Sequence, residues 1–153
     1  MSIQASIIIP NFNGLGLLED CLSSVFTQTY KNFEVIIVDN NSTDSSLIFI
    51  KEKFPKVKII KLKKNYGFAF AINKGVIFAK GKFVILLNND TKLDKNYLKN
   101  LIDCVKTHKE VISVNPKILN FDNTKIIDGL GILINEVGQA KSIAWNEKDK
   151  GQY

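Results

Sequence analysis

The most informative segment of this chain reads Phe83-Val84-Ile85-Leu86-Leu87-Asn88-Asn89-Asp90-Thr91. A run of apolar residues with the length of a buried strand ends there in two amides and a carboxylate. The same pattern occurs earlier, in Val35-Ile36-Ile37-Val38-Asp39-Asn40-Asn41. Ligands of open α/β sheets bind just outside the carboxyl ends of the strands. Two acidic strand ends therefore predict a site for a metal ion and a polar, phosphorylated ligand.

Strand and helix patterns alternate along most of the chain. Strands are expected at 5–9, 33–38, 57–62, 82–87 and 111–114, and helices at 15–26, 47–54, 67–79 and 95–107. On the third helix we expect Phe70, Ile77 and Phe78 to face the core, and Gly81 to stop the helix. This order predicts a three-layer α/β/α architecture around a mostly parallel sheet with right-handed crossovers.

The signal weakens beyond Pro116. The segments 117–121, 125–128 and 132–135 resemble short strands or hairpin arms, and the last dozen residues show no periodicity. A chain of 153 residues is long enough for one domain with a sizeable core, so a single domain is expected.

Composition bears on the partners and the location expected for this chain. The net charge of +6 comes from lysine alone, because the chain contains no arginine, and sequence-specific nucleic-acid binding is therefore not expected. The lysines are spread along the sequence apart from Lys61, Lys63 and Lys64, which leaves a mild attraction to anionic lipid or to a phosphorylated ligand open. The first residues lack the pattern of a signal peptide. We expect a cytoplasmic location, with peripheral contact at the inner face of the cell membrane as an open alternative.

The chain lacks the common phosphate-binding loops. The segment Pro10–Gly16 matches the Gly-x-Gly-x-x-Gly pattern only in part, and no Walker-A loop is present. Asp90 is the best candidate for holding a phosphorylated ligand, through Mg²⁺ or Mn²⁺, and Asn88 would contact the waters of the cation or a ribose hydroxyl. The structural alternative is an Asx turn over Asn88–Thr91.

Two other segments carry candidate ligand contacts. The Asp39 carboxylate can accept hydrogen bonds from a ribose or from the N–H of a uracil or thymine ring, although it can equally cap the turn that follows. Gly67 allows a ligand to approach the backbone closely, Asn65 precedes it, and Asn73 lies two helical turns further on. The aromatic residues Phe68 and Phe70 in this segment are interpreted as core residues.

Together the segments Ser6–Gly14, Val35–Asp44, Asn65–Gly75 and Leu86–Thr91 resemble the N-terminal half of inverting family-2 glycosyltransferases. The nearest branch is the rhamnosyltransferase-like enzymes of bacterial and archaeal surface-polysaccharide synthesis. The resemblance implies the GT-A nucleotide-diphospho-sugar transferase fold, which is Rossmann-like, truncated here at the C-terminus. It also implies a donor of the UDP or dTDP type and a glycan or lipid-linked acceptor.

The resemblance further implies roles for individual residues. Pro10 and Asn11 would line the base pocket, Asp39 would contact the base, and Asp90 would bind Mn²⁺ or Mg²⁺. Asn88-Asn89-Asp90 stands where the family has its Asp-x-Asp motif, so the first carboxylate is replaced by an amide. The other donor-binding residues implied are Asn13, Asn65, Gly67, Asn73, Asn88 and Asn89.

One departure from the family concerns catalysis. The general base, usually an aspartate in a Glu-Asp pair, has no counterpart after Asp90 and is expected beyond Tyr153. Residues 1–115 would therefore form the donor-binding region, and 116–153 the start of an incomplete acceptor-side region. We expect a chain that binds donor without robust sugar transfer and that self-associates through uncovered apolar surface. The alternatives are a non-catalytic nucleotide-sugar-binding or assembly module and a nucleotidyltransferase.

Overall fold

The computed structural model describes residues 2–153, which form two compact units. The first unit ends at Lys99, and the second runs from Asn100 to Tyr153. The division into a donor region, 1–115, and an acceptor-side region, 116–153, concerns function and stays a prediction. No helix within residues 2–153 is long and apolar enough to cross a membrane.

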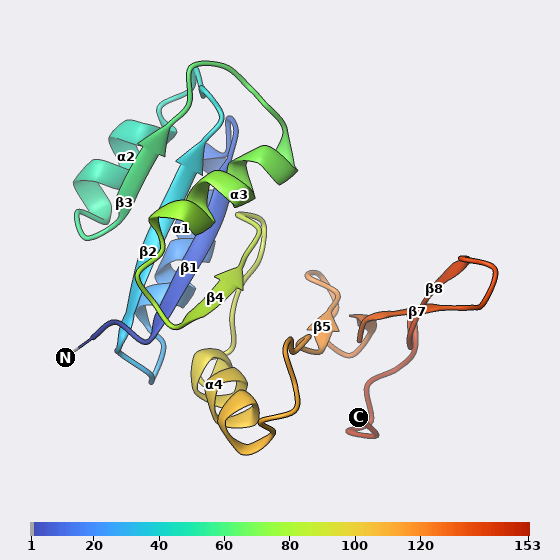
Figure 1. The fold of residues 1–153 in the computed structure, drawn as a ribbon. Coiled ribbons are helices and arrows are strands. Elements are labelled where there is room, and N and C mark those ends of the chain that lie inside the picture. The colour runs from blue at the N-terminus through green and yellow to red at the C-terminus, as the bar shows by residue number, and fades with distance from the viewer. Residues whose placement is uncertain (1) are drawn as a thin grey trace. The chain divides into compact units, whose positions relative to one another are not determined.

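A four-stranded parallel sheet forms the centre of the first unit (Figure 1). Its strands lie in the order β3-β2-β1-β4. They are β1 (Ala5–Asn11), β2 (Phe33–Asp39), β3 (Lys58–Lys61) and β4 (Phe83–Leu86). Every residue of β1 is buried, as expected for a central strand with both faces covered. The predicted α/β architecture with a parallel sheet is confirmed.

Four helices lie within or close to their predicted ranges. They are α1 (Leu15–Phe26), α2 (Ser46–Lys53), α3 (Phe68–Phe78) and α4 (Tyr97–Thr107). Helix α3 packs across β1 and β2, whereas α1 and α2 contact each other on the opposite face of the sheet (Figure 1). On α1 the predicted apolar stripe, which includes Leu18, Leu22 and Val25, is buried. The first unit therefore has the predicted three layers.

Helix α3 turns a different face to the sheet than the sequence predicted. Ala71, Ile72 and Gly75 are its buried residues. Phe70, Ile77 and Phe78 were expected in the core but are 46%, 73% and 39% exposed, so that prediction was wrong. The cause is close packing on small residues, since a Cβ on Gly75 would lie 2.4 Å from the Ile8 side chain. At Gly75 no side chain fits between the helix and the sheet, so the face with Phe70, Ile77 and Phe78 turns away from the core.

Gly81 has a different role from the one predicted. Helix α3 already ends at Phe78, so Gly81 is not its stop. A Cβ on Gly81 would lie 2.5 Å from the backbone carbon of Ala5. The glycine therefore allows the chain to pass close to the first strand as it enters β4.

The second unit contains two small antiparallel pairs of strands. The first pair is β5 (Ile118–Leu119) with β6 (Ile127–Gly129), and the second is β7 (Ile132–Ile134) with β8 (Ala140–Ser142). Three of these short strands were predicted, whereas the Ala-Lys-Ser sequence of β8 carries no strand pattern. The predicted strand at 111–114 was wrong, because that segment is irregular. Ile112 is fully exposed there, so no burial favours an extended pairing.

Candidate functional site at the carboxyl end of the sheet

The carboxyl ends of all four strands of the first sheet, with the loops that follow them, enclose an open cavity of about 350 Å³. This volume lies at the lower end of the range for small-molecule sites. The residues that line it are Pro10, Asn11, Phe12, Asn40, Asn65, Gly67, Phe68, Asn88, Asn89 and Asp90. The lining is rich in amides and contains one carboxylate, which suits a polar ligand.

Most of the predicted site residues meet in this cavity. Those that line it are Pro10, Asn11, Asn65, Gly67, Asn88, Asn89 and Asp90, whereas Asn13, Asp39 and Asn73 do not. Phe12, Asn40 and Phe68 also line it and were missed. Phe12 lies within the segment Ser6–Gly14 and Asn40 within Val35–Asp44, so their positions were the available signal. Phe68 was interpreted as a core residue but is 59% exposed.

Asp90 presents a free carboxylate to the cavity. Its side chain is exposed and lies directly after the two amides that follow β4. Within residues 2–153, its carboxylate takes part in no hydrogen bond or ion pair. Such a carboxylate is ready to accept a cation, because nothing in the described protein neutralises its charge.

Asp39 is in the opposite situation. It is 0% exposed, and its Oδ1 accepts hydrogen bonds from Asn11 Nδ2 at 3.1 Å and from Ser42 Oγ at 2.5 Å. Its Oδ2 accepts a third hydrogen bond from the Ser42 backbone N–H at 3.0 Å. Three donors thus satisfy a carboxylate that does not line the cavity. The predicted contact between Asp39 and a nucleotide base stays a prediction.

Asn11 connects this buried carboxylate to the loop that carries Asp90. Its Nδ2 donates to Asp39 and, at 3.2 Å each, to the hydroxyls of Ser42 and Ser46. Its Oδ1 accepts a hydrogen bond from Asn89 Nδ2 at 3.0 Å. One buried amide therefore ties the loops that follow β1, β2 and β4 together.

Gly14 makes room for this connection. A Cβ at this position would lie 2.3 Å from Asn89 Nδ2 and 2.4 Å from Asn11 Oδ1. Both distances are far below van der Waals contact, and both atoms are engaged in the same hydrogen bond. Any side chain here would separate Asn11 from Asn89.

Asn13 and Asp44 join the loops after β1 and β2 from outside the cavity. The Asn13 Oδ1 accepts the Thr43 backbone N–H at 2.8 Å, and the Asp44 Oδ2 accepts the Leu15 N–H at 3.0 Å. Burial alone would raise the pKa of Asp44, but hydrogen bonds from Ser46 and Leu15 outweigh it and lower the pKa. Both residues therefore position the loops.

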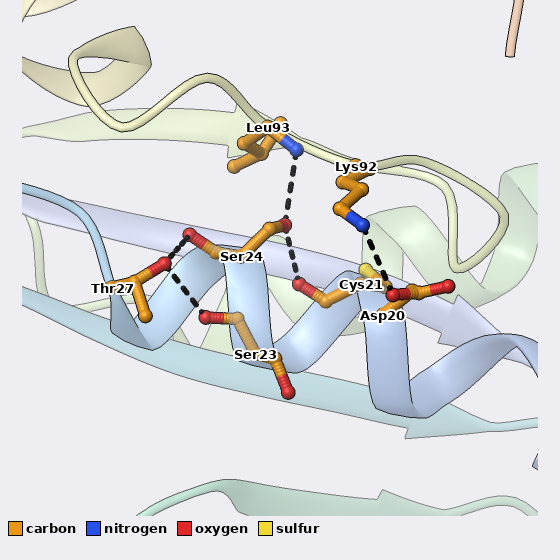
Figure 2. A network of polar contacts seen from close by, with 7 residues as sticks. All are labelled: Asp20, Cys21, Ser23, Ser24, Thr27, Lys92 and Leu93. Atoms are coloured by element: carbon orange, nitrogen blue, oxygen red, sulfur yellow. Dashed lines mark hydrogen bonds and ion pairs between the residues drawn. The ribbon is translucent and has the colours of Figure 1, made fainter.

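The segment after Asp90 is held against α1 (Figure 2). Ser24 Oγ accepts the Leu93 backbone N–H at 3.0 Å and donates to the Cys21 carbonyl at 2.7 Å. Lys92 Nζ lies 3.3 Å from Asp20 Oδ1 at the surface. These contacts fix the exit of the loop and thereby limit the motion of the carboxylate.

Cys21, on α1, contacts the same loop. Its thiol donates to the Asn88 carbonyl at a Sγ–O distance of 3.6 Å. Burial raises the pKa of Cys21 to about 11, a hydrogen bond from Thr91 opposes the shift, and the negative charge of Asp90 adds to it. At neutral pH this cysteine is a protonated structural thiol.

A second, larger hollow of about 700 Å³ lies in the second unit. It is bordered by β8 and by Trp145, Glu147 and Tyr153. None of the predicted site residues lies there. The cavity of the first unit is therefore the candidate site.

Comparison with known proteins agrees with this geometry. The sequence pattern described as glycosyl transferase family 2 matches residues 6–147. The chain belongs to this family. The family-2 resemblance stated from the motifs is therefore confirmed.

Two relatives illustrate the range of the family. The first is dolichyl N-acetyl-alpha-D-glucosaminyl phosphate 3-beta-D-2,3-diacetamido-2,3-dideoxy-beta-D-glucuronosyltransferase of Methanococcus voltae. It is 32% identical over 144 residues, which are 90% of this chain and 41% of that protein. The putative teichuronic acid biosynthesis glycosyltransferase TuaG of Bacillus subtilis is 34% identical over 101 residues, 64% of this chain and 40% of TuaG. The chain thus spans about two fifths of the length of these relatives.

Solved structures confirm the GT-A fold. Residues 1–349 of S. aureus TarS, in complex with UDP-GlcNAc, superpose with a TM-score of 0.66 at 28% identity, over 69% of this chain and 32% of that one. The mannosyltransferase PcManGT from Pyrobaculum calidifontis, in complex with GDP-Man and Mn²⁺, gives a TM-score of 0.67 at 20% identity, over 82% and 39%. At that identity the second likeness concerns the fold alone.

Proposed function

We propose that this chain is the donor-binding half of an inverting, metal-dependent glycosyltransferase of cell-surface polysaccharide synthesis. The donor would be a nucleoside-diphosphate sugar, and the acceptor a glycan or a lipid-linked glycan. Membership of glycosyl transferase family 2 and the likeness to TuaG support this reaction class. The donor class is supported by TarS, which binds UDP and UDP-GlcNAc.

The observation that carries the proposal is the free carboxylate of Asp90 in an amide-lined cavity. The cavity lies at the carboxyl edge of a parallel sheet, where nucleotides bind in open α/β folds. The amides of Asn11, Asn65 and Asn88 offer both donors and acceptors, which suits ribose and diphosphate groups. Phe12 offers an exposed ring at the same rim, which suits a base.

The residues present fit a hard divalent cation. Asp90 and Asn88 supply oxygen atoms, which Mg²⁺ and Mn²⁺ prefer. Residues 2–153 hold no cluster of three or more acidic, histidine or cysteine side chains that would bind a metal. The Asp90 carboxylate would therefore hold the ion together with diphosphate oxygens and water. When bound, the cation would offset the charge that develops on the leaving diphosphate.

We place the general base outside residues 1–153. The acceptor hydroxyl needs a proton acceptor for attack on the anomeric carbon. Asp149 is unsuited, because hydrogen bonds from Lys117 and from the Gly151 N–H lower its pKa. Asp39 and Asp44 are already engaged as hydrogen-bond acceptors within the loops.

Calorimetric titration of UDP, dTDP and GDP, each with and without Mn²⁺, tests the proposal and names the base. The expected result is metal-dependent binding of the uridine or thymidine diphosphate, and no robust sugar transfer by the chain alone. Absence of binding for every nucleotide would contradict the proposal and favour an assembly module.

A further inference from the structure

The positive charge of this protein is concentrated in one segment. Residues 54–89, which run from the end of α2 through β3 and α3 to the loop after β4, contain eight lysines and no aspartate or glutamate. The remaining residues carry 13 lysines against 15 acids, a slight negative excess. The prediction that the lysines are scattered therefore overlooked the distribution of the acids.

The same segment exposes aromatic side chains on α3. Phe70, Lys74 and Phe78 follow one another at intervals of one helical turn, so they lie on one stripe. The Tyr66 ring stacks on Phe70 with a centroid distance of 4.5 Å and an interplanar angle of 23°. Tyr66, Phe70 and Phe78 are 42%, 46% and 39% exposed. Ile77, next to this stripe on the helix, is 73% exposed.

Lysine side chains lie over two of these rings. The Lys64 Nζ is 5.1 Å from the centroid of Tyr66, and the Nζ atoms of Lys58 and Lys74 are 4.8 and 5.5 Å from that of Phe78. These contacts form two clusters, one around Tyr66 and one around Phe78, and the helical spacing from Phe70 to Phe78 places both along one stripe. We call it the α3 stripe, and it comprises Lys58, Lys64, Tyr66, Phe70, Lys74 and Phe78.

This combination fits a charged, partly apolar surface. Aromatic and aliphatic side chains insert at the boundary between lipid headgroups and acyl chains, and flanking lysines attract anionic headgroups. A nucleic acid would be attracted by the lysines but would gain nothing from the exposed Ile77. The chain also has no arginine to form paired hydrogen bonds with a base or a phosphate. We propose that the α3 stripe docks the protein on the surface of an anionic lipid bilayer.

Docking there has a consequence for the candidate site. Tyr66 lies between Asn65 and Gly67, both of which line the cavity. The mouth of the cavity would therefore open beside the lipid surface, within reach of a lipid-linked molecule. The proposal uses no cavity-lining residue, so it stands or falls independently of nucleotide binding.

Vesicle flotation of the chain tests the proposal. We expect binding to phosphatidylcholine vesicles that contain about 30% phosphatidylglycerol, little binding to phosphatidylcholine alone, and weaker binding as salt rises. Absence of binding to the anionic vesicles at low salt would overturn the proposal. Equal competition by a DNA duplex at the same charge concentration would overturn it in favour of a general polyanion surface.

A matched pair of substitutions locates the surface. Ile77→Asp changes an exposed residue beside the stripe, and Ile112→Asp makes the same change at a fully exposed position of the second unit. Both variants have the same net charge and should keep their circular dichroism spectra. We expect Ile77→Asp to weaken vesicle binding about tenfold and Ile112→Asp less than about twofold. Equal losses would overturn the proposal.

A second pair guards against misfolding of the first. The double variant Lys58→Gln with Lys74→Gln removes two charges from the stripe, and Lys106→Gln with Lys109→Gln removes two exposed charges elsewhere. The first should lose binding by at least about tenfold more than the second. Equal effects would show that only net charge matters and would contradict a docking face.

Discussion

The ends of β2 and β4 look alike in the sequence and differ in the structure. β2 ends in Asp39, and Asp90 follows β4 in the loop, each beside asparagines. Yet Asp39 is fully buried and accepts three hydrogen bonds, whereas Asp90 is exposed and free. Asp39 binds the loops of the protein together, and Asp90 is available to a ligand. The number of donors that already reach a carboxylate, more than its position, decides which role it can take.

The largest expected effect is a difference in the free energy of unfolding between variants of these two aspartates. Asp39→Ala removes the acceptor of three buried hydrogen bonds and leaves the Ser42 N–H and hydroxyl unpaired, so it should lower the free energy of unfolding by about 3 kcal/mol. Asp90→Ala should change it by less than about 0.5 kcal/mol, because no hydrogen bond is lost. Urea unfolding followed by circular dichroism measures both. Equal losses in the two variants would remove the distinction.

The connection between the two strand ends gives the next effect. Gly14→Ala should lower the free energy of unfolding by about 1–3 kcal/mol, because the new methyl group collides with the Asn11–Asn89 hydrogen bond. Gly16→Ala is the control, since a Cβ there meets nothing within 4 Å. It lies inside α1 and should stabilise the protein by about 0.5–1 kcal/mol. If both substitutions stabilise the protein, Gly14 is not needed to make room for the Asn11–Asn89 hydrogen bond.

Local sequence patterns predicted the strands and helices of the first unit well. The apolar runs of β1 and β2 fit only one interpretation, a buried strand, because both faces of these strands are buried. The orientation of α3 was less predictable, because apolar residues occupy several faces of that helix and close packing at Gly75 decides among them. The segment 111–114 shows that an apolar run without burial does not form a strand.

The location of the site was easier to predict from the sequence than the role of each residue in it. Strand ends gather at one edge of a parallel sheet, so Asn11, Asn88 and Asp90 were expected to meet. The saturation of Asp39 depends on Asn11 and Ser42, which come from the end of β1 and from the loop after β2. The two hydrogen bonds from Ser42, three residues after Asp39, match the turn cap that the sequence left as an alternative, whereas no local pattern reports the contact with Asn11.

The reactivity of Cys21 tests the burial of this thiol and also reports the charge of Asp90. In a Cys104→Ser background, Cys21 should react with a disulfide reagent at pH 8 about a hundredfold more slowly in the folded than in the unfolded protein. Its pKa is raised from 9.0 to about 11, so the unfolded thiol ionises first. The free energy of unfolding should therefore fall as pH rises from about 9 to about 11. Equal folded and unfolded rates would contradict the burial of this thiol.

The smallest expected effect uses the same thiol. Asp90→Asn removes a nearby negative charge and should speed the reaction of Cys21 by less than about threefold. Mn²⁺ bound at Asp90 should act in the same direction. No change with either would place the charge of Asp90 away from the thiol.

The central claim is that Asp90 serves a ligand and not the fold. Its most direct test is the Mn²⁺-dependent affinity for UDP of Asp90→Asn and of the unaltered chain, with thermal unfolding measured in the same buffer. We predict that the variant unfolds at the same temperature and loses the part of the affinity that depends on Mn²⁺. A variant that binds UDP with undiminished dependence on Mn²⁺, or that unfolds at a clearly lower temperature, would contradict the account.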